Sequence, residues 1–143
     1  MSEENSIMWT TGEYTELGKI RSRVISRAVN FGFSDDDAQK IALAVDEACS
    51  NLIQHAYNFD KKRKIGIAFS CEGYKFIIRI YDDGIPFDPK EVTPPDMKEY
   101  FKEFRRGGLG IHIIRKIMDE IEYIPGSGKN GRNLLELRKN LQS

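Results

Sequence analysis

Residues 45–57 of the chain read VDEACSNLIQHAY, and the spacing of polar and apolar residues in this stretch predicts an amphipathic helix. Glu47, Asn51 and Gln54, with Asn58 just beyond, follow one another at spacings of four, three and four residues. In a helix these spacings place the polar side chains in one narrow stripe. An apolar stripe lies about 100° to 160° around the same helix. It comprises Ile41, Val45, Ala48 and Leu52. The polar stripe therefore borders the predicted core.

Glu47 and Asn51 are candidates for metal binding and proton transfer, because a carboxylate stands one helical turn before a carboxamide. Oxygen atoms of these two kinds are suited to Mg²⁺, directly or through water. A carboxylate in this position can also accept a proton from a nucleophile. Taken alone, the stripe is also explained as a solvated helix face.

The chain before this stretch predicts a first helix and the start of the second. Residues 14–31 carry apolar side chains at helical spacing, and Gly32 ends that helix. Ser34 is a good N-cap for the second helix, and three acids at 35–37 occupy its first turn, where the helix dipole favours negative charge. We expect the second helix to run to about Tyr57.

After the second helix the hydrophobic period changes from about 3.6 residues to about 2, which indicates strands. The predicted strands, with an edge strand near the N-terminus, are residues 6–10, 65–70, 74–81, 121–124 and 133–138. Residues 86–106 hold four prolines and many charges, which is typical of a functional lid or a disordered loop. A third helix begins at Gly108, and its predicted core face comprises Leu109, Ile113, Ile117 and Ile121.

This order of elements predicts an α+β two-layer sandwich. A mixed, mostly antiparallel sheet is expected to be covered on one face by three main helices. Residues 1–143 are expected to form a single domain, a normal length for one hydrophobic core. The order lacks the βαβ alternation of a Rossmann domain, and the sequence contains no P-loop motif.

Composition narrows the classes of function. The chain is 40% hydrophobic and 31% charged, the balance of a globular protein, and its 22 basic and 22 acidic residues cancel. A neutral total does not favour direct binding of nucleic acid or of an anionic membrane. No apolar run approaches the roughly 20 residues of a membrane helix, and residues 1–6 do not resemble a secretory signal. We therefore expect a cytoplasmic protein.

A second candidate block is YDDGIPF at residues 81–87, where a predicted strand ends in two acids and a glycine. Asp82 can accept a hydrogen bond from an amino group, such as that of adenine. Gly84 allows the backbone to come close to a ligand or to take a positive φ. Taken alone, this block is also explained as a turn.

A third candidate block is RRGGLG at residues 105–110, at the predicted start of the third helix. Glycines at a helix N-terminus leave backbone N–H groups unobstructed, and the helix dipole adds positive potential, so the block suits a phosphate group. The two arginines can assist, because a guanidinium pairs well with phosphate oxygens. Glycine-rich helix starts are common, and the block is not specific by itself.

The three blocks occur in a specific order, with a lid between the second and the third. Together, VDEACSNLIQHAY, YDDGIPFDP and RRGGLGIHIIRKIMDEIEY, followed by GRNLLELRK, resemble the GHKL (Bergerat-fold) ATP-binding superfamily. Within it, the chain is most similar to the bacterial anti-sigma-factor serine/threonine kinases. The resemblance covers roughly residues 17–139 and includes the superfamily's N, G1 and G2 boxes.

The resemblance implies a role for each matching residue. Glu47 would be the general base that activates the acceptor hydroxyl or a water. Asn51 would hold Mg²⁺, which bridges the ATP phosphates. Asp82 would bind the adenine amino group, and Gly84 would line the adenine pocket. The phosphates would be cradled by Gly108, Leu109 and Gly110. Residues 88–106 would form the ATP lid.

The same resemblance implies a function and partners. The protein would sequester a sigma factor and phosphorylate an anti-anti-sigma antagonist, and it would form a homodimer. The alternative is a non-catalytic module in which ATP orders the lid and thereby controls a protein interaction. That alternative is motivated by Pro86 and Arg106, which stand where the superfamily often has glycine. A third reading is a fragment of a larger phosphatase or sensor protein.

Overall fold

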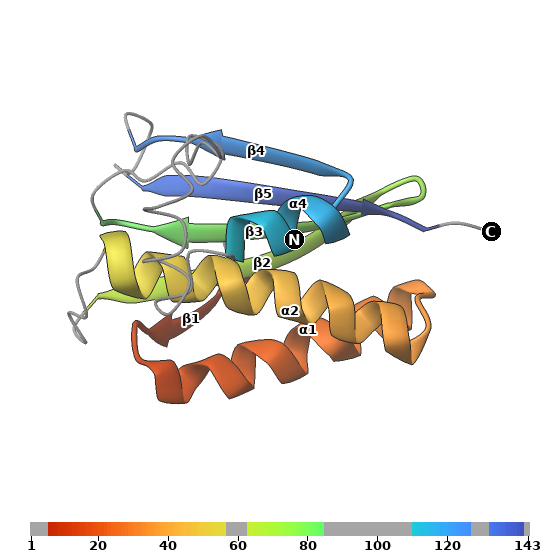
Figure 1. Cartoon of the computed structure of the whole chain (residues 1–143), viewed down its shortest axis with the longest axis horizontal. Coiled ribbons are helices and arrows are strands. Elements are labelled where there is room, and N and C mark those ends of the chain that lie inside the picture. The colour runs from red at the N-terminus through yellow and green to blue at the C-terminus, as the bar shows by residue number, and fades with distance from the viewer. Residues whose placement is uncertain (1–5, 57–62, 85–109, 127–131, 142–143) are drawn as a thin grey trace.

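The computed structural model describes residues 6–56, 63–84, 110–126 and 132–141, which form a helical layer against a sheet (Figure 1). The helical layer contains η2 (Tyr14–Glu16), α1 (Leu17–Phe31), α2 (Asp35–Asn51), η3 (Leu52–Ala56) and α4 (Gly110–Ile117). The sheet contains β1 (Met8–Thr11), β2 (Lys64–Glu72), β3 (Lys75–Asp82), β4 (Glu120–Ile124) and β5 (Asn133–Asn140). The predicted α+β two-layer sandwich is confirmed.

The strands lie in the order β1-β2-β3-β5-β4, and every neighbouring pair in this sheet is antiparallel. We predicted a mixed, mostly antiparallel sheet, whereas the four described pairings contain no parallel pair. The reason is the order of the strands. The connection through α4 makes β3 and β4 run in the same direction, but β5 returns between them and pairs with both. Two strands that run in the same direction are therefore separated by a third.

The helix boundaries follow from local signals in the sequence. The Ser34 hydroxyl accepts a hydrogen bond from the backbone N–H of Asp37 at 3.2 Å, which caps the start of α2. Gly32 ends α1 with a φ of 130°, a conformation that side chains other than glycine rarely adopt. None of the helices within the described ranges is long and apolar enough to cross a membrane.

The core lies between the helices and one face of the sheet. Strand alternation sends Ile65 and Ile67 of β2, and Ile78 and Ile80 of β3, toward the helices, where all four are fully buried. The apolar stripe predicted for α2 is buried against them. Each large aliphatic side chain buried in this way contributes about 2 kcal/mol. This core holds the C-terminal end of α2 over the end of β3.

The core face of α4 differs from our prediction. The buried residues are Ile111, Ile114 and Met118, whereas Ile113 and Ile117 are half-buried. Leu109 lies outside the described residues, and Ile121 belongs to β4 rather than to the helix. This short helix carries isoleucines on two faces, so its hydrophobic pattern did not select one of them. Its contact with α2 and the sheet selected the Ile111–Ile114 face.

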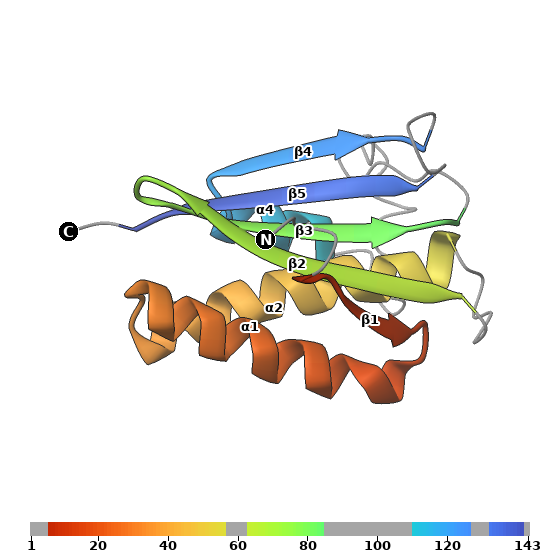
Figure 2. The same ribbon diagram turned by 180° about the vertical axis from the view of Figure 1, so that it is seen from behind.

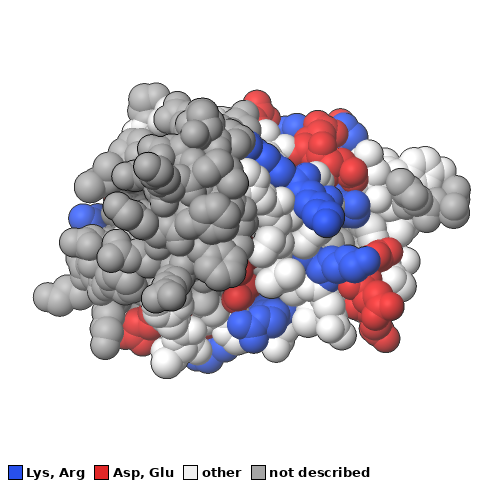
Figure 3. Space-filling view, in the orientation of Figure 1, with Lys and Arg blue, Asp and Glu red and all other residues white. Residues whose placement is uncertain are grey.

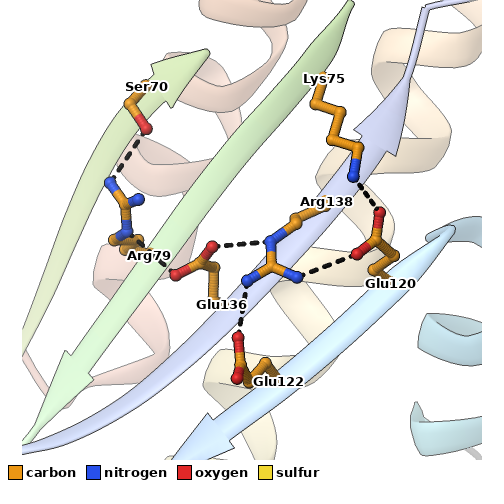
Figure 4. A network of polar contacts seen from close by, with 7 residues as sticks. All are labelled: Ser70, Lys75, Arg79, Glu120, Glu122, Glu136 and Arg138. Atoms are coloured by element: carbon orange, nitrogen blue, oxygen red, sulfur yellow. Dashed lines mark hydrogen bonds and ion pairs between the residues drawn. The ribbon is translucent and has the colours of Figure 1, made fainter. Parts of the chain in front are cut away.

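The opposite face of the sheet carries a network of charged side chains (Figure 4). Figure 2 shows the molecule from this side, with the strands in front of α4. The guanidinium of Arg138 binds Glu136 at 2.7 Å, Glu120 at 3.0 Å and Glu122 at 2.6 Å. Lys75, and to a smaller extent Arg138, lower the pKa of Glu120. The two faces of the sheet therefore differ, one apolar and covered by helices, the other ionic.

Candidate functional site

The C-terminal end of α2 presents the first two candidate residues. Glu47 is half-buried, and Asn51, the last residue of α2, is 6% exposed. The chain then changes to a π-helical turn, η3, instead of continuing as the α-helix that we predicted to Tyr57. Such turns inside or beside α-helices are frequent at functional sites, because they displace the side chains that follow. The predicted polar stripe is therefore regular from Glu47 to Asn51 and is interrupted after it.

Both side chains are available to a ligand. Within the described residues, no hydrogen bond or ion pair engages the Glu47 carboxyl or the Asn51 carboxamide. Burial, together with the negative charge of Asp46, raises the pKa of Glu47. A carboxylate with a raised pKa is a stronger proton acceptor than an exposed one.

The end of β3 presents the next candidate, Asp82, which is 2% exposed. Its Oδ1 accepts hydrogen bonds from the Gly84 backbone N–H and from the Asn133 side-chain amide, both at 2.9 Å. Burial raises the pKa of Asp82 even though these two hydrogen bonds act in the opposite direction. In the described part of the chain, the Oδ2 atom has no hydrogen-bond partner. This oxygen can accept a hydrogen bond from an amino group.

Asn133 holds this arrangement together. Its Nδ2 donates to Asp82 and, at 3.0 Å, to the Gly84 carbonyl, while its Oδ1 accepts from the Gly126 N–H at 2.7 Å. Asn133 is the register partner of Asp82 and is 1% exposed. We predicted no role for Asn133 from the sequence. The signal was present, because Asn133 precedes Leu135 and Leu137 at the spacing of an inward-facing strand position.

Two features show that the end of α2 and the end of β3 belong to one region. Cys49 lies on α2 between Glu47 and Asn51, and the Asp82 carboxylate is close enough to contribute to the raised pKa of its buried thiol. In addition, α4 packs against α2 and begins on the side of the molecule where α2 and β3 end (Figure 1). The predicted acid, carboxamide and strand-end carboxylate therefore surround one end of the helical layer.

The remaining predicted positions are only partly described. Gly110 is the first residue of α4, so the third block does lead into a helix. Gly108, Leu109 and the predicted lid at 88–106 lie outside the described residues. The structure thus locates Glu47, Asn51, Asp82, Gly84 and the helix start at Gly110.

A cavity of about 440 Å³ adjoins the same end of the sheet from its other face. Its described lining residues are Trp9, Lys64, Asp82, Asp83 and Arg132. The Arg132 guanidinium lies 4.8 Å from the centre of the Trp9 ring. Strand alternation places Lys64 and Asp83 away from the helices, whereas Asp82 lies on the same face of β3 as Ile78 and Ile80. The cavity therefore adjoins Asp82, and its described lining does not include Glu47 or Asn51.

The geometry so far defines an α+β domain with a polar region between α2, the end of β3 and the start of α4. The family model described as histidine kinase-like ATPase domain matches residues 10–139. The chain belongs to the histidine kinase-like ATPase domain family, within the GHKL superfamily.

Curated relatives match most of the chain. A serine-protein kinase RsbW from Bacillus thuringiensis (strain Al Hakam) is 32% identical over 120 residues, which cover 81% of this chain and 73% of the relative. A serine-protein kinase RsbW from Bacillus licheniformis is 32% identical over 116 residues, which cover 78% and 72%. The resemblance to serine/threonine kinases of this type is therefore confirmed by full-domain similarity.

Solved structures share the fold. A chain in the crystal structure of the SiaB–SiaC complex from Pseudomonas aeruginosa matches with a TM-score of 0.58 at 15% identity, covering 94% of this chain and 89% of that one. The histidine kinase domain from Erythrobacter litoralis EL346 matches with a TM-score of 0.53 at 20% identity. The match covers 90% of this chain, which spans 60% of the length of that kinase domain chain. At these identities the comparison concerns the fold.

Proposed function

We propose that the protein is an ATP-binding serine/threonine protein kinase of the anti-sigma-factor type. The observation that carries this proposal is the placement of Glu47 and Asn51 near the end of α2, on the same side of the molecule as the end of β3, where Asp82 stands (Figure 1). No hydrogen bond or ion pair to a described residue engages Glu47 or Asn51. A nucleotide-binding region needs Asp82 and the helix start at Gly110, but a proton acceptor beside them is needed only for chemistry. The relatives named serine-protein kinases support the same assignment.

The proposed roles follow from the chemistry of each group. Oδ2 of Asp82 accepts a hydrogen bond from the adenine amino group, and Gly84 allows the ring to approach the backbone. The backbone N–H groups at Gly108, Leu109 and Gly110 bind phosphate oxygens at the positive end of α4.

The Asn51 carboxamide oxygen would hold Mg²⁺, and no hydrogen bond to a described residue engages it. Mg²⁺ supplies neutralisation of phosphate charge in phosphoryl transfer. Glu47 accepts the proton of the attacking hydroxyl, and its raised pKa suits this task.

The proposed acceptor is an anti-anti-sigma antagonist protein, and the proposed sequestered partner is a sigma factor. A homodimer and a cytoplasmic location are part of the same proposal. The SiaB–SiaC complex, in which a chain of this fold occurs, supports action on a protein partner. Residues 1–143 are proposed to act as one domain, with residues 88–106 as the ATP lid.

The proposal is tested by removing the proton acceptor while keeping its shape. Glu47→Gln should lower the rate of phosphate transfer from labelled ATP to a candidate antagonist by about 10²-fold or more. The affinity for ATP and Mg²⁺, measured by calorimetry, should change by less than about threefold. Glu72→Gln, at an exposed position in the turn region of β2, is the matched control and should leave both quantities unchanged.

The same experiment separates the kinase from the non-catalytic module. Phosphate transfer that survives Glu47→Gln would contradict the role given to Glu47. A protein that binds ATP tightly but transfers no phosphate to any antagonist, and whose partner binding is unaffected by Glu47→Gln, would be the ATP-ordered module instead.

A further inference from the structure

A groove of about 440 Å³ runs between α2 and α4, on the helical side of the molecule. Its described lining comes from three elements: Lys40 and Leu43 of α2, Ile113, Lys116 and Ile117 of α4, and Lys139 of β5. None of these residues belongs to the region assigned above to ATP or to proton transfer. The groove therefore needs an explanation of its own.

The floor of the groove is apolar. Leu43 is 43% exposed, although α2 is otherwise a core helix. Ile113 and Ile117 of α4 are half-buried, and Ile117 also packs against the edge of the core. Three large aliphatic side chains that face one another across a groove, partly exposed, are typical of a surface that binds another chain.

The rim of the groove is basic. Within the described residues, Lys40 and Lys116 take part in no ion pair, and the Lys139 ammonium is 3.8 Å from Asp119. The described lining contains one acid, Asp37. Figure 3 shows basic side chains on this face of the molecule, with acidic side chains beside them. The groove thus carries local positive charge in a chain whose formal net charge is zero.

The groove also points toward the proposed proton acceptor. Leu43 and Glu47 are four residues apart on α2, so Glu47 follows Leu43 on the same face about 6 Å farther along the helix axis. A polypeptide segment that covers Leu43 therefore brings its neighbouring residues next to Glu47.

We propose that the α2–α4 groove docks an acidic segment of the phosphoacceptor protein, with apolar side chains anchored on Leu43, Ile113 and Ile117. The inference rests on the proposed kinase function and adds the chemistry by which the acceptor is recognised. Carboxylates of the segment pair with Lys40 and Lys116, neither of which forms an ion pair within the described ranges, and this charge complementarity selects the segment.

The alternative occupant with negative charge is a nucleic acid. Nucleic-acid binding is dominated by cations that contact phosphates, whereas this groove places aliphatic side chains between its lysines. An acidic peptide with leucine-like anchors uses both features, and a nucleic acid uses only the lysines.

The test measures binding of a defined probe by fluorescence anisotropy. The probe is a short labelled peptide of glutamate and leucine residues, and the control probe has lysine in place of glutamate. The wild-type protein should bind the acidic probe and not the basic one. The double variant Lys40→Glu/Lys116→Glu should weaken binding of the acidic probe by about tenfold or more, and Leu43→Ser should weaken it severalfold. The charge-conserving variant Lys40→Arg/Lys116→Arg should retain binding.

Several results would overturn the proposal. The proposal is wrong if the acidic probe does not bind at millimolar concentration, or if the wild type and the Glu double variant bind it equally. It is also wrong if a single-stranded oligonucleotide binds more tightly than the acidic probe and Leu43→Ser does not affect that binding. The last result would assign the lysines to nucleic acid. All variants change exposed or half-exposed side chains, and their folding is checked by thermal unfolding.

Failure of the docking inference is distinguishable from failure of the kinase proposal. Peptide binding is measured without nucleotide, so it does not depend on phosphate transfer. With an antagonist that the wild type phosphorylates, the Glu double variant should raise KM for the antagonist and leave kcat and ATP affinity unchanged. An unchanged KM would contradict docking while leaving the kinase intact.

Discussion

Asp82 and Glu47 are two carboxyl groups whose pKa is raised by burial at one end of the helical layer. Because the pKa of each group is higher in the folded chain than in the unfolded chain, ionisation of the group favours unfolding. The stability that these groups contribute is therefore largest at acidic pH. It is lost as the pH rises through the folded-state pKa. At neutral pH both carboxylates therefore reduce stability, which is consistent with selection for binding and proton transfer.

Asp46 provides a test of how Glu47 is tuned. Its carboxylate contributes to the raised pKa of Glu47, and it pairs with the Arg21 guanidinium of α1 at 3.0 Å. Asp46→Asn removes this negative charge, so the pKa of Glu47 should fall. Since a general base acts in its deprotonated form, the rising limb of the kcat/KM–pH profile for phosphate transfer should move to lower pH.

A control on the same helix separates this effect from a general change in charge. Asp36→Asn removes a carboxylate eleven residues before Glu47, about 16 Å from it along the helix axis. That distance exceeds the screening length of roughly 8 Å at physiological salt, so the profile should not move. A rising limb that stays in place or moves to higher pH in Asp46→Asn would contradict the tuning by Asp46.

At the scale of elements, Asn133 joins the ends of three strands. Asn133→Ala removes the amide that donates to Asp82 and Gly84 and the oxygen that accepts from Gly126. Because these are buried polar groups, the free energy of unfolding should fall by about 2 kcal/mol. The affinity for ATP should fall as well, since Asp82 loses a hydrogen bond that orients its carboxylate.

The matched control is Asn140→Ala, at the other, exposed end of the same strand. Its unfolding free energy in urea should match that of the wild type. If Asn133→Ala unfolds at the same urea concentration as Asn140→Ala, the cross-strand bonds do not stabilise this end of the sheet.

The elements also show which parts of the molecule were predictable from sequence. The Ser34 cap, the edge strand and the alternation in β2 and β3 are local signals, and the structure follows them. The core face of α4 was not predictable from the sequence, because both Ile111 and Ile113 have helical spacing to later isoleucines. Only the contact of α4 with α2 determines which of the two is buried. The π-helical turn after Asn51 and the hydrogen bonds of Asn133 likewise depend on residues distant in sequence. The sequence predicted Glu47, Asn51 and Asp82 as site residues because the three blocks occur in a specific order, and their roles stay a prediction.

At the scale of the whole molecule, the helical side and the uncovered side of the sheet differ in the sites that we propose for them. The helical side carries the proposed site and the basic groove between α2 and α4 (Figure 3). The uncovered side of the sheet carries the Arg138 network, in which basic and acidic side chains satisfy one another. A neutral net charge therefore conceals a local positive surface on one face. The predicted homodimer stays a prediction at this scale.

We propose above that Asp82 binds the adenine amino group of ATP. Calorimetric titration of the protein with ATP and Mg²⁺ measures this interaction directly. Asp82→Asn keeps the Oδ1 acceptor used by Gly84 and Asn133 but replaces the Oδ2 acceptor with an NH₂ donor. We expect the wild type to bind ATP more tightly than GTP, and Asp82→Asn to lose about 10- to 100-fold in ATP affinity without a loss of folding stability. An ATP affinity that is the same in the wild type and Asp82→Asn would contradict the role proposed for Asp82.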